Sequence, residues 1–215
     1  MTDGNASHSM RFALFASGAR FSCAVFDQLI FMDCLPDLLV VPQYPPADTK
    51  PGIVEVQSAS DFLSRTNDTD IELLHAPREW QSRCAVTIRD RNIDFILIAC
   101  WPYLIEPVLY TSSKQATLNM HPSRLPRYRG ANPLQQQIAA VDLNCGVSLH
   151  LLNDQFDRGD IVKQAEFEAK PNAFNLESIE QHCAKVGVEM FIEVMASGQA
   201  NWRSRQRPDQ ASETD

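Results

Sequence analysis

Short apolar runs alternate with amphipathic stretches through the first part of the chain. Runs without polar interruption are typical of strands buried on both faces of a sheet, and they occur at 11–16, 37–42, 94–100 and 116–121. Apolar residues recur at helical spacing between them, which predicts amphipathic helices at 20–32 and 78–92. Strands that alternate with helices indicate a parallel, Rossmann-like sheet.

The pattern changes in the second part of the chain. Apolar and polar residues alternate at 145–152 and 161–169, which predicts two strands added antiparallel to the sheet. Further helices are predicted at 104–110, 131–141 and 175–196. The pattern as a whole predicts an α/β protein with a single Rossmann-like domain over residues 10–200, whose mostly parallel sheet has an antiparallel extension. We expect flexible tails at 1–9 and 201–215, and a surface loop in the Pro-rich segment 43–52.

Composition narrows the class of protein. Hydrophobic residues make up 44% of the 215 residues, enough for a packed core. The formal charge of −8 argues against a general nucleic-acid coat, which needs a basic face. The six cysteines form no C-x-x-C pair, so we expect reduced, buried thiols and no metal site. The N-terminus is polar and no apolar stretch reaches membrane-spanning length, so we expect a soluble, cytoplasmic protein without a membrane partner.

A polar pair stands at the end of the predicted strand 116–121. Side chains two residues apart in a strand point to the same face, so Asn119 and His121 project together while Met120 points away. The amide and the imidazole could donate hydrogen bonds to one oxygen, as acyl transfer requires when a carbonyl develops negative charge. The alternative is structural, with an asparagine that caps a turn and a histidine that binds backbone.

The predicted sheet places three turns around one crevice. In open α/β sheets, ligands bind beyond the carboxyl ends of the parallel strands. Each of three parallel strands is predicted to deliver a residue to that edge, namely Gly18, Trp101 and His121.

A second polar turn joins the two alternating strands. Asp157 and Asp160 flank Gly159 in FDRGDIV at 156–162, and these are ordinary turn residues. A carboxylate beside a histidine would instead fix the tautomer of the imidazole and stabilise its charged form. Periodicity alone leaves open whether Asp157 reaches His121.

The two polar segments together resemble a known family. NMHPSRLPRYRGANP followed by CGVSLHLLNDQFDRGDIV is similar to the folate-dependent formyltransferases, which include the catalytic domain of methionyl-tRNA formyltransferase. The family also includes glycinamide ribonucleotide and sugar-amine formyltransferases and formyltetrahydrofolate hydrolases. RFALFASGARFS at 11–22 resembles the family's first strand and loop, and ACWPYLIEPVLY at 99–110 stands at its folate-contacting strand end. The resemblance covers about residues 10–170.

The resemblance implies a catalytic trio of Asn119, His121 and Asp157, with 10-formyltetrahydrofolate as the formyl donor and no metal. Asn119 and His121 would hold the developing oxyanion, and Asp157 would orient His121 and help to remove a proton from the acceptor amine. Donor contacts are implied for Trp101, Pro102, Tyr103, Leu104, Asp154 and Asp160. Acceptor contacts are implied for Ser17, Gly18, Ser123, Arg124, Arg127, Arg129 and Gly130, with a structural turn contact for Ser123.

Four positions depart from the family's pattern. Arg124 adds to Arg127 and Arg129, so the loop is either a solvated basic surface or a site for an anionic acceptor. Arg158 could pair with Asp157 or reach the glutamate tail of the folate. Trp101-Pro102 replaces the usual Tyr-Gly, which removes a backbone donor but adds a ring that could stack on the pterin. Apart from these four positions, we expect His150, on the alternating strand 145–152, to be structural rather than functional.

The resemblance implies transfer of a formyl group to a primary amine, with an acceptor such as a small anionic amine, for example an amino sugar nucleotide. ASGAR at 16–20 is not the phosphate loop of a glycinamide ribonucleotide enzyme, which lowers that acceptor in rank. About 18 residues follow Ser197, too few for the C-terminal barrel of the methionyl-tRNA enzymes, so we expect weak tRNA binding at best. The alternatives are a 10-formyltetrahydrofolate hydrolase that releases formate and a non-catalytic folate-binding remnant. The oligomeric state stays open, because apolar residues of 175–196 could also support a dimer.

Overall fold

The computed structural model describes residues 10–42, 62, 64–67, 69–76 and 80–197. The flexible tails expected at 1–9 and 201–215 and the surface loop expected at 43–52 lie outside the described residues. No helix in the described part of the chain is long and apolar enough to span a membrane.

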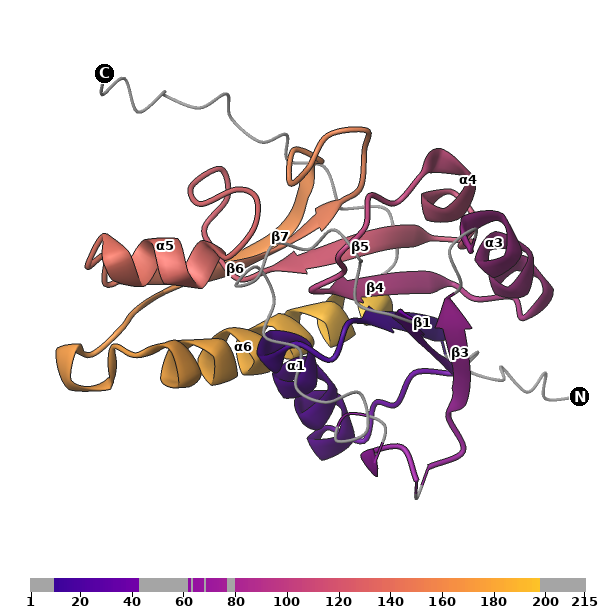
Figure 1. Cartoon of the computed structure of the whole chain (residues 1–215), viewed down its shortest axis with the longest axis horizontal. Coiled ribbons are helices and arrows are strands. Elements are labelled where there is room, and N and C mark those ends of the chain that lie inside the picture. The colour runs from indigo at the N-terminus through magenta and orange to yellow at the C-terminus, as the bar shows by residue number, and fades with distance from the viewer. Residues whose placement is uncertain (1–9, 43–61, 63, 68, 77–79, 198–215) are drawn as a thin grey trace, which may run out of the picture.

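Apart from the strand at 72–76 and a short 3₁₀ helix at 171–173, the described helices and strands follow the predicted order along the chain (Figure 1). They are β1 (Phe12–Ala16), α1 (Arg20–Phe31), β2 (Leu38–Pro42), β3 (Glu72–Ala76), α3 (Gln81–Asp90), β4 (Phe95–Ala99), α4 (Pro107–Tyr110), β5 (Ala116–His121), α5 (Pro133–Ala139), β6 (Asn144–Leu151), β7 (Ile161–Glu168), a short 3₁₀ helix η1 (Pro171–Ala173) and α6 (Leu176–Ser197).

These strands form one seven-stranded sheet in the order β3-β2-β1-β4-β5-β6-β7. The first five strands are parallel, and β6 and β7 extend the sheet antiparallel beyond β5. The prediction of a Rossmann-like, mostly parallel sheet with an antiparallel extension is therefore confirmed.

Helices cover both faces of the sheet. Alternate residues of β1 separate the two cores: Phe12 and Leu14 pack with α1 and α6, while Phe15 packs with α3 and α4. Because every residue of β1 and β4 is buried, both strands carry the uninterrupted apolar runs seen in the sequence. The two-sided cover leaves the carboxyl ends of the parallel strands as the edge where turns can gather a site.

Candidate active site

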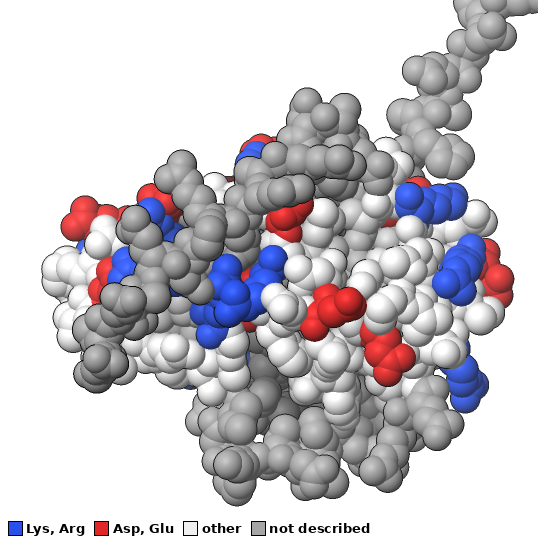
Figure 2. Space-filling model, turned by 90° about the horizontal axis from the view of Figure 1, so that it is seen from above, with Lys and Arg blue, Asp and Glu red and all other residues white. Residues whose placement is uncertain are grey.

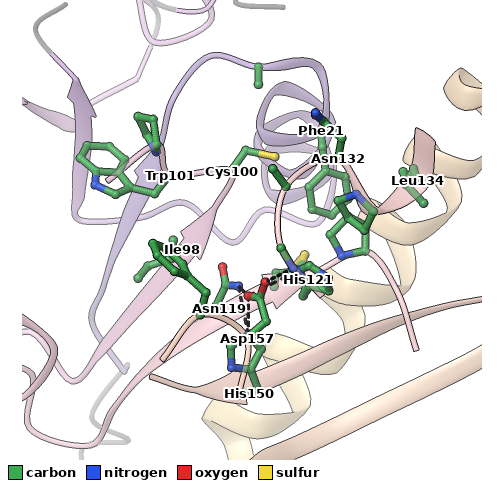
Figure 3. Close-up of a pocket in the computed structure, with 18 of the residues that line it drawn as sticks. Phe21, Ile98, Cys100, Trp101, Asn119, His121, Asn132, Leu134, His150 and Asp157 are labelled. Atoms are coloured by element: carbon green, nitrogen blue, oxygen red, sulfur yellow. Dashed lines mark hydrogen bonds and ion pairs between the residues drawn. The ribbon is translucent and has the colours of Figure 1, made fainter. Parts of the chain in front are cut away.

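A pocket of about 760 Å³ lies at the carboxyl ends of β4 and β5. One side is formed by the turn after β4, and the other by the start of α1, the segment that leads into α5, and α6 (Figure 3). The labelled side chains show this division: Trp101 lies on one side, and Phe21, Asn132 and Leu134 lie on the other. Asn119, His121 and Asp157 lie between the two sides, so a group bound on either side would meet the same polar centre.

The structure brings Asn119, His121 and Asp157 together (Figure 3). Asn119 and His121 share one face of β5, and Met120 packs on the other face against Gly187 of α6. The amide Nδ2 of Asn119 donates to Asp157 Oδ1 at 3.2 Å, and His121 Nδ1 lies 3.5 Å from the same oxygen. The geometry thus gathers the predicted trio at one point of the pocket, while its catalytic role remains a proposal.

His150 is a fourth member of this centre. Its Nδ1–H donates to the carbonyl oxygen of Leu151 at 2.8 Å, so Nε2 of the neutral ring is an acceptor. Nε2 lies 3.0 Å from Asn119 Nδ2 and 3.4 Å from Asp157 Oδ1. Sequence reasoning, which expected a structural role for His150, did not place it at this centre, because its position follows from the register that pairs His150 with Asn119 across β5 and β6.

A backbone carbonyl fixes the tautomer of His121. The Nε2–H donates to the carbonyl oxygen of Tyr128 at 2.8 Å, which leaves the lone pair of the neutral ring on Nδ1, facing Asp157. Burial lowers the pKa of His121 below its ordinary value, and the charge of Asp157 opposes this only in part. His121 is therefore neutral near pH 7, with the basic nitrogen directed at the polar centre.

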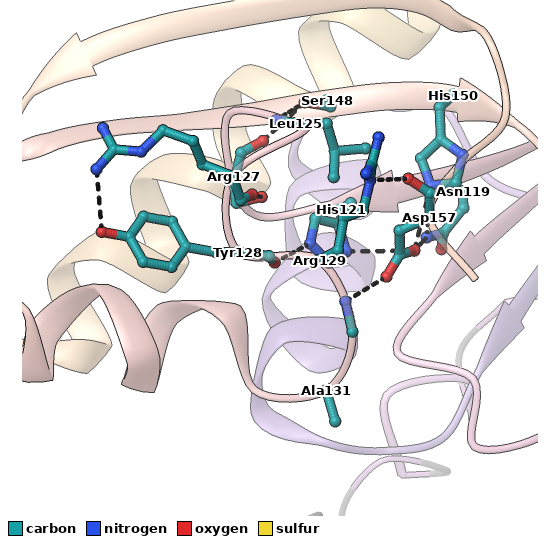
Figure 4. A network of polar contacts seen from close by, with 12 residues as sticks. Asn119, His121, Leu125, Arg127, Tyr128, Arg129, Ala131, Ser148, His150 and Asp157 are labelled. Carbon is teal, nitrogen blue, oxygen red and sulfur yellow. Dashed lines mark hydrogen bonds and ion pairs between the residues drawn. The ribbon is translucent and has the colours of Figure 1, made fainter. Parts of the chain in front are cut away.

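Asp157 is an ionised carboxylate held from several directions. Its Oδ2 accepts the backbone N–H of Gly130 at 2.8 Å, and its carbonyl oxygen accepts Arg129 Nε at 3.1 Å (Figure 4). Burial alone would raise the pKa of Asp157, but a hydrogen bond from the protonated form of His150, the charge of the protonated form of His121 and the Gly130 N–H together lower it to about 2. Arg158 is exposed beside it and is not needed to account for the low pKa.

Gly159 lets the loop between β6 and β7 deliver Asp157. A Cβ at this position would lie 1.6 Å from the carbonyl oxygen of Leu151, so the loop passes too close for any other residue. The Leu151 N–H then donates to the Asp160 carbonyl oxygen at 2.9 Å, which closes the loop. The glycine between the two aspartates is thus a structural requirement of the turn that holds Asp157.

The buried imidazole of His121 should make stability fall at mildly acid pH. Its folded-state pKa lies below the ordinary value of 6.5, so the unfolded chain takes up a proton first, and the stabilisation is complete only above pH 6.5. Asp157, with a pKa of about 2, does not titrate in that range. We expect the free energy of unfolding to decrease from about pH 7.5 to about pH 5.5, and to decrease less in His121→Asn. Denaturant unfolding at both pH values measures this, and equal decreases in the two proteins would contradict it.

The predicted donor residues divide into two groups. Trp101, Pro102, Tyr103 and Leu104 line the pocket, and the Trp101 ring packs edge-on against Phe15 and Trp80 at centroid distances of 5.3 and 5.1 Å. Asp154 and Asp160 are not among the lining residues.

The two aspartates have other roles in the loop. Asp154 Oδ1 accepts the hydroxyl of Tyr110 at 3.0 Å, and Asp160 contributes its carbonyl to the loop closure. Phe156, which sequence reasoning missed, lines the pocket with 65% of its surface exposed. An exposed phenylalanine in a turn gives no periodic signal, so only its place at the pocket identifies it.

Most predicted acceptor residues are not among the residues that line the pocket. Of the seven, only Gly130 lines it, and the others are Ser17, Gly18, Ser123, Arg124, Arg127 and Arg129. Ser17 Oγ accepts the N–H of Ala19 at 3.2 Å, and Ser123 Oγ donates to the Arg127 carbonyl oxygen at 2.8 Å, the structural turn contact expected for it.

The arginine loop, residues 122–130, directs two of its arginines to carboxylates elsewhere. Arg124 pairs with Glu166 of β7 at 2.5 Å, and Arg127 pairs with Asp142 at 2.8 Å. The charged residues that line the other side of the pocket are instead Arg20 and Glu180, which pair at 3.1 Å. Two of the three arginines thus have carboxylate partners outside the pocket, whereas Arg129 donates to the Asp157 carbonyl oxygen beside it.

Arg124→Leu is expected to leave the KM of both substrates unchanged. The guanidinium is paired with Glu166 and does not line the pocket, so its loss removes a partly exposed ion pair, typically worth at most about 1 kcal/mol. Steady-state kinetics with the donor and acceptor varied in turn measure both values. A rise confined to the KM of the acceptor would restore Arg124 to the acceptor site.

The sequence was compared with protein-family models and with known proteins. The family model described as formyl transferase matches residues 31–195. Methionyl-tRNA formyltransferase of Rickettsia massiliae is 32% identical over 106 residues, covering 49% of this chain and 35% of that protein. The enzyme of Rickettsia bellii is 28% identical over 153 residues, covering 71% and 49%. The chain thus spans about a third to a half of the length of these relatives.

Solved structures agree on the fold. Glycinamide ribonucleotide transformylase 1 from Symbiobacterium toebii matches with a TM-score of 0.65 and 17% identity, over 87% of this chain and 86% of that one. A formyltetrahydrofolate deformylase from Pseudomonas syringae matches with a TM-score of 0.61 and 18% identity, over 88% and 60%. The family model covers more than half of the chain, and it covers the segments that carry the polar trio. This chain therefore belongs to the formyl transferase family.

Proposed function

We propose that this protein transfers a formyl group from 10-formyltetrahydrofolate to a primary amine, and that Asn119, His121 and Asp157 are its catalytic residues. The observation that carries the proposal is the meeting of these three side chains between the two sides of one pocket (Figure 3). Membership of the formyl transferase family supports the same chemistry.

One side of the pocket suits a flat, partly apolar donor. Its volume of about 760 Å³ lies within the usual range for small-molecule sites. Trp101, Tyr103, Leu104 and Phe156 supply aromatic and apolar surface. The buried indole N–H of Trp101 has no hydrogen-bond partner in the described part of the chain, and a ring with an acceptor atom would give it one. The residues present therefore fit the folate donor.

The donor supplies a formyl carbon that the acceptor amine attacks. His121 Nδ1 can take up a proton, and the resulting imidazolium would face Asp157 and could donate to the formyl oxygen as negative charge develops there. One amide hydrogen of Asn119 points to His150 and the other points to Asp157. The longer of these contacts, at 3.2 Å to Asp157, is the one that the formyl oxygen would replace. Over the reaction one proton moves from the amine to the departing nitrogen, and Asp157, ionised at neutral pH, is placed to pass it through water.

The other side of the pocket is proposed to take the acceptor. Phe21, Leu134 and Leu176 contribute apolar surface, and Arg20 and Glu180 balance each other's charge. This supports a primary amine whose neighbouring group is uncharged, rather than the anionic amine inferred from the three arginines. An amino sugar nucleotide would then have to keep its phosphates outside the pocket.

We propose a small-molecule acceptor rather than tRNA. The similar Rickettsia proteins are named for methionyl-tRNA, and that acceptor is the alternative to be tested. On the face shown in Figure 2, basic side chains form one small group near the centre and otherwise lie singly among acidic and uncharged side chains. Phosphate contacts dominate nucleic-acid affinity, so a face of this kind favours weak binding.

Calorimetric titration with 10-formyltetrahydrofolate or a stable 5-deaza analogue, with formate release followed in parallel, tests the function. We expect saturable donor binding, little formate release without an amine, and formylated product when a panel of primary amines is added. Fast formate release without an amine, well above that of His121→Ala, would identify a hydrolase instead. Absence of donor binding would overturn the proposal and favour a folate-binding remnant that has lost its ligand.

A further inference from the structure

We propose that Tyr128 is a positioning residue for His121, and that its side chain, anchored by Asp142 and Arg127, holds the carbonyl that fixes the imidazole tautomer. The role in turnover rests on the proposed function, whereas the tautomer itself can be measured without it. Figure 4 shows the contacts that link Arg127, Tyr128, His121 and Asp157.

The backbone of Tyr128 is strained where it meets His121. Its φ is 55°, in the left-handed region that a bulky residue rarely adopts. In this conformation the Tyr128 carbonyl accepts His121 Nε2–H at 2.8 Å. Such a conformation persists only when the surroundings hold it in place.

The side chain of Tyr128 provides that hold. Its hydroxyl donates to Asp142 Oδ2 at 2.8 Å, and Arg127 pairs with the same oxygen at 2.8 Å. The Arg127 guanidinium also lies 5.3 Å from the centre of the Tyr128 ring. Asp142 Oδ1 accepts the backbone N–H of Asn144 at 3.1 Å, at the start of β6. A strained residue of the arginine loop is thus tied to the sheet through one carboxylate.

Loss of this anchor has a defined chemical consequence. If Tyr128 relaxes out of the left-handed region, His121 Nε2–H loses its acceptor. The neutral ring can then carry its hydrogen on Nδ1 and donate it to Asp157, which lies 3.5 Å away. Nδ1 is then no longer free to accept a proton. Turnover should fall while donor binding is spared, because the donor side of the pocket is built from the turn after β4.

Tyr128→Phe tests the anchor, because it removes only the hydroxyl. We expect kcat to fall by about 10- to 100-fold, part of the 10²–10⁴ that a positioned base contributes, with the dissociation constant of the donor unchanged. The ¹⁵N chemical shifts of the His121 ring should move from the Nε2–H toward the Nδ1–H pattern. Tyr110→Phe is the matched control, since it loses an equivalent bond to Asp154 away from His121, and it should leave the His121 shifts unchanged.

Two further variants separate positioning from a general loss of structure. Asp142→Asn keeps an acceptor oxygen for the Tyr128 hydroxyl and should retain more activity than Asp142→Ala. Tyr128→Gly, which tolerates a positive φ, should recover part of the kcat that Tyr128→Ala loses. Adding Tyr128→Phe to Asp142→Ala should cause little further loss, because the Tyr128 hydroxyl has then already lost its carboxylate acceptor.

The His121 ring shifts decide between the outcomes. If they do not change in Tyr128→Phe, the proposal is overturned, whether or not kcat falls. If the wild-type protein neither binds the donor nor forms formylated product, the proposed function fails. The ¹⁵N chemical shifts of the His121 ring still test whether Tyr128 fixes the tautomer.

Discussion

His121→Ala is expected to lower kcat by about 10²–10³-fold or more, the usual cost of removing a donor to a developing oxyanion. The imidazole is buried, its tautomer is fixed by the Tyr128 carbonyl, and its basic Nδ1 faces Asp157. Alanine removes the proton acceptor and the oxyanion donor together. Single-turnover measurements with saturating donor separate this loss from any change in product release.

A matched control distinguishes catalysis from stability. His182 lies on α6 against Phe167, at a ring-centroid distance of 4.2 Å, and does not line the pocket. His182→Ala should therefore keep wild-type kcat, and donor binding measured by calorimetry should be similar in both variants. Near-normal turnover in His121→Ala would remove His121 from the mechanism.

The fold was predictable where burial imposes a simple pattern. β1 and β4 are buried along their whole length, so their apolar runs stand out from the flanking turns. β3 differs, because its five residues are mostly exposed or half-buried and offer neither a continuous run nor a clear alternation. The sequence from 53 to 75 indicates at most one short strand, one short helix and another strand without clear bounds, so the edge strand Glu72–Ala76 could not be delimited from it, unlike its partner β2.

The candidate site was predictable only where the contacts are local. The spacing of Asn119 and His121 guarantees a shared face of one strand, and the structure places both side chains at the polar centre. His150 reaches the same centre through the register of β6 against β5, which no sequence periodicity encodes. A histidine in an alternating strand can face either core or pocket, so pattern alone gave it a structural role.

The contacts of the arginine loop also could not be predicted from local sequence. Three arginines within six residues suggested a site for an anion, yet Arg124 and Arg127 pair with Glu166 and Asp142. Those carboxylates lie 42 and 15 positions further along the chain, so local composition could not reveal that the charges were already paired. The left-handed backbone of Tyr128 was equally hidden, because tyrosine carries no preference for it.

Asp157→Asn is expected to lower kcat by about 10²-fold or more while changing donor affinity little. The substitution keeps the size of the side chain but removes the negative charge that faces His121 Nδ1 and opposes the lowering of its pKa. The imidazolium loses its counter-charge, and the neutral amide can no longer carry the proton from the amine. The loss should therefore fall on the chemical step, because the aromatic and apolar wall of the donor side is left intact.

Comparison of kcat with the calorimetric dissociation constant of the donor provides the measurement. Asp27→Asn is a suitable control, since it makes the same chemical change outside the pocket. Asp27 lies on α1 and forms an ion pair with Arg65. It should leave both quantities unchanged. If Asp157→Asn weakened donor binding as much as it slowed turnover, Asp157 would be a binding residue. The low pKa of its carboxyl would then reflect the hydrogen bonds that fold the loop rather than a part in proton transfer.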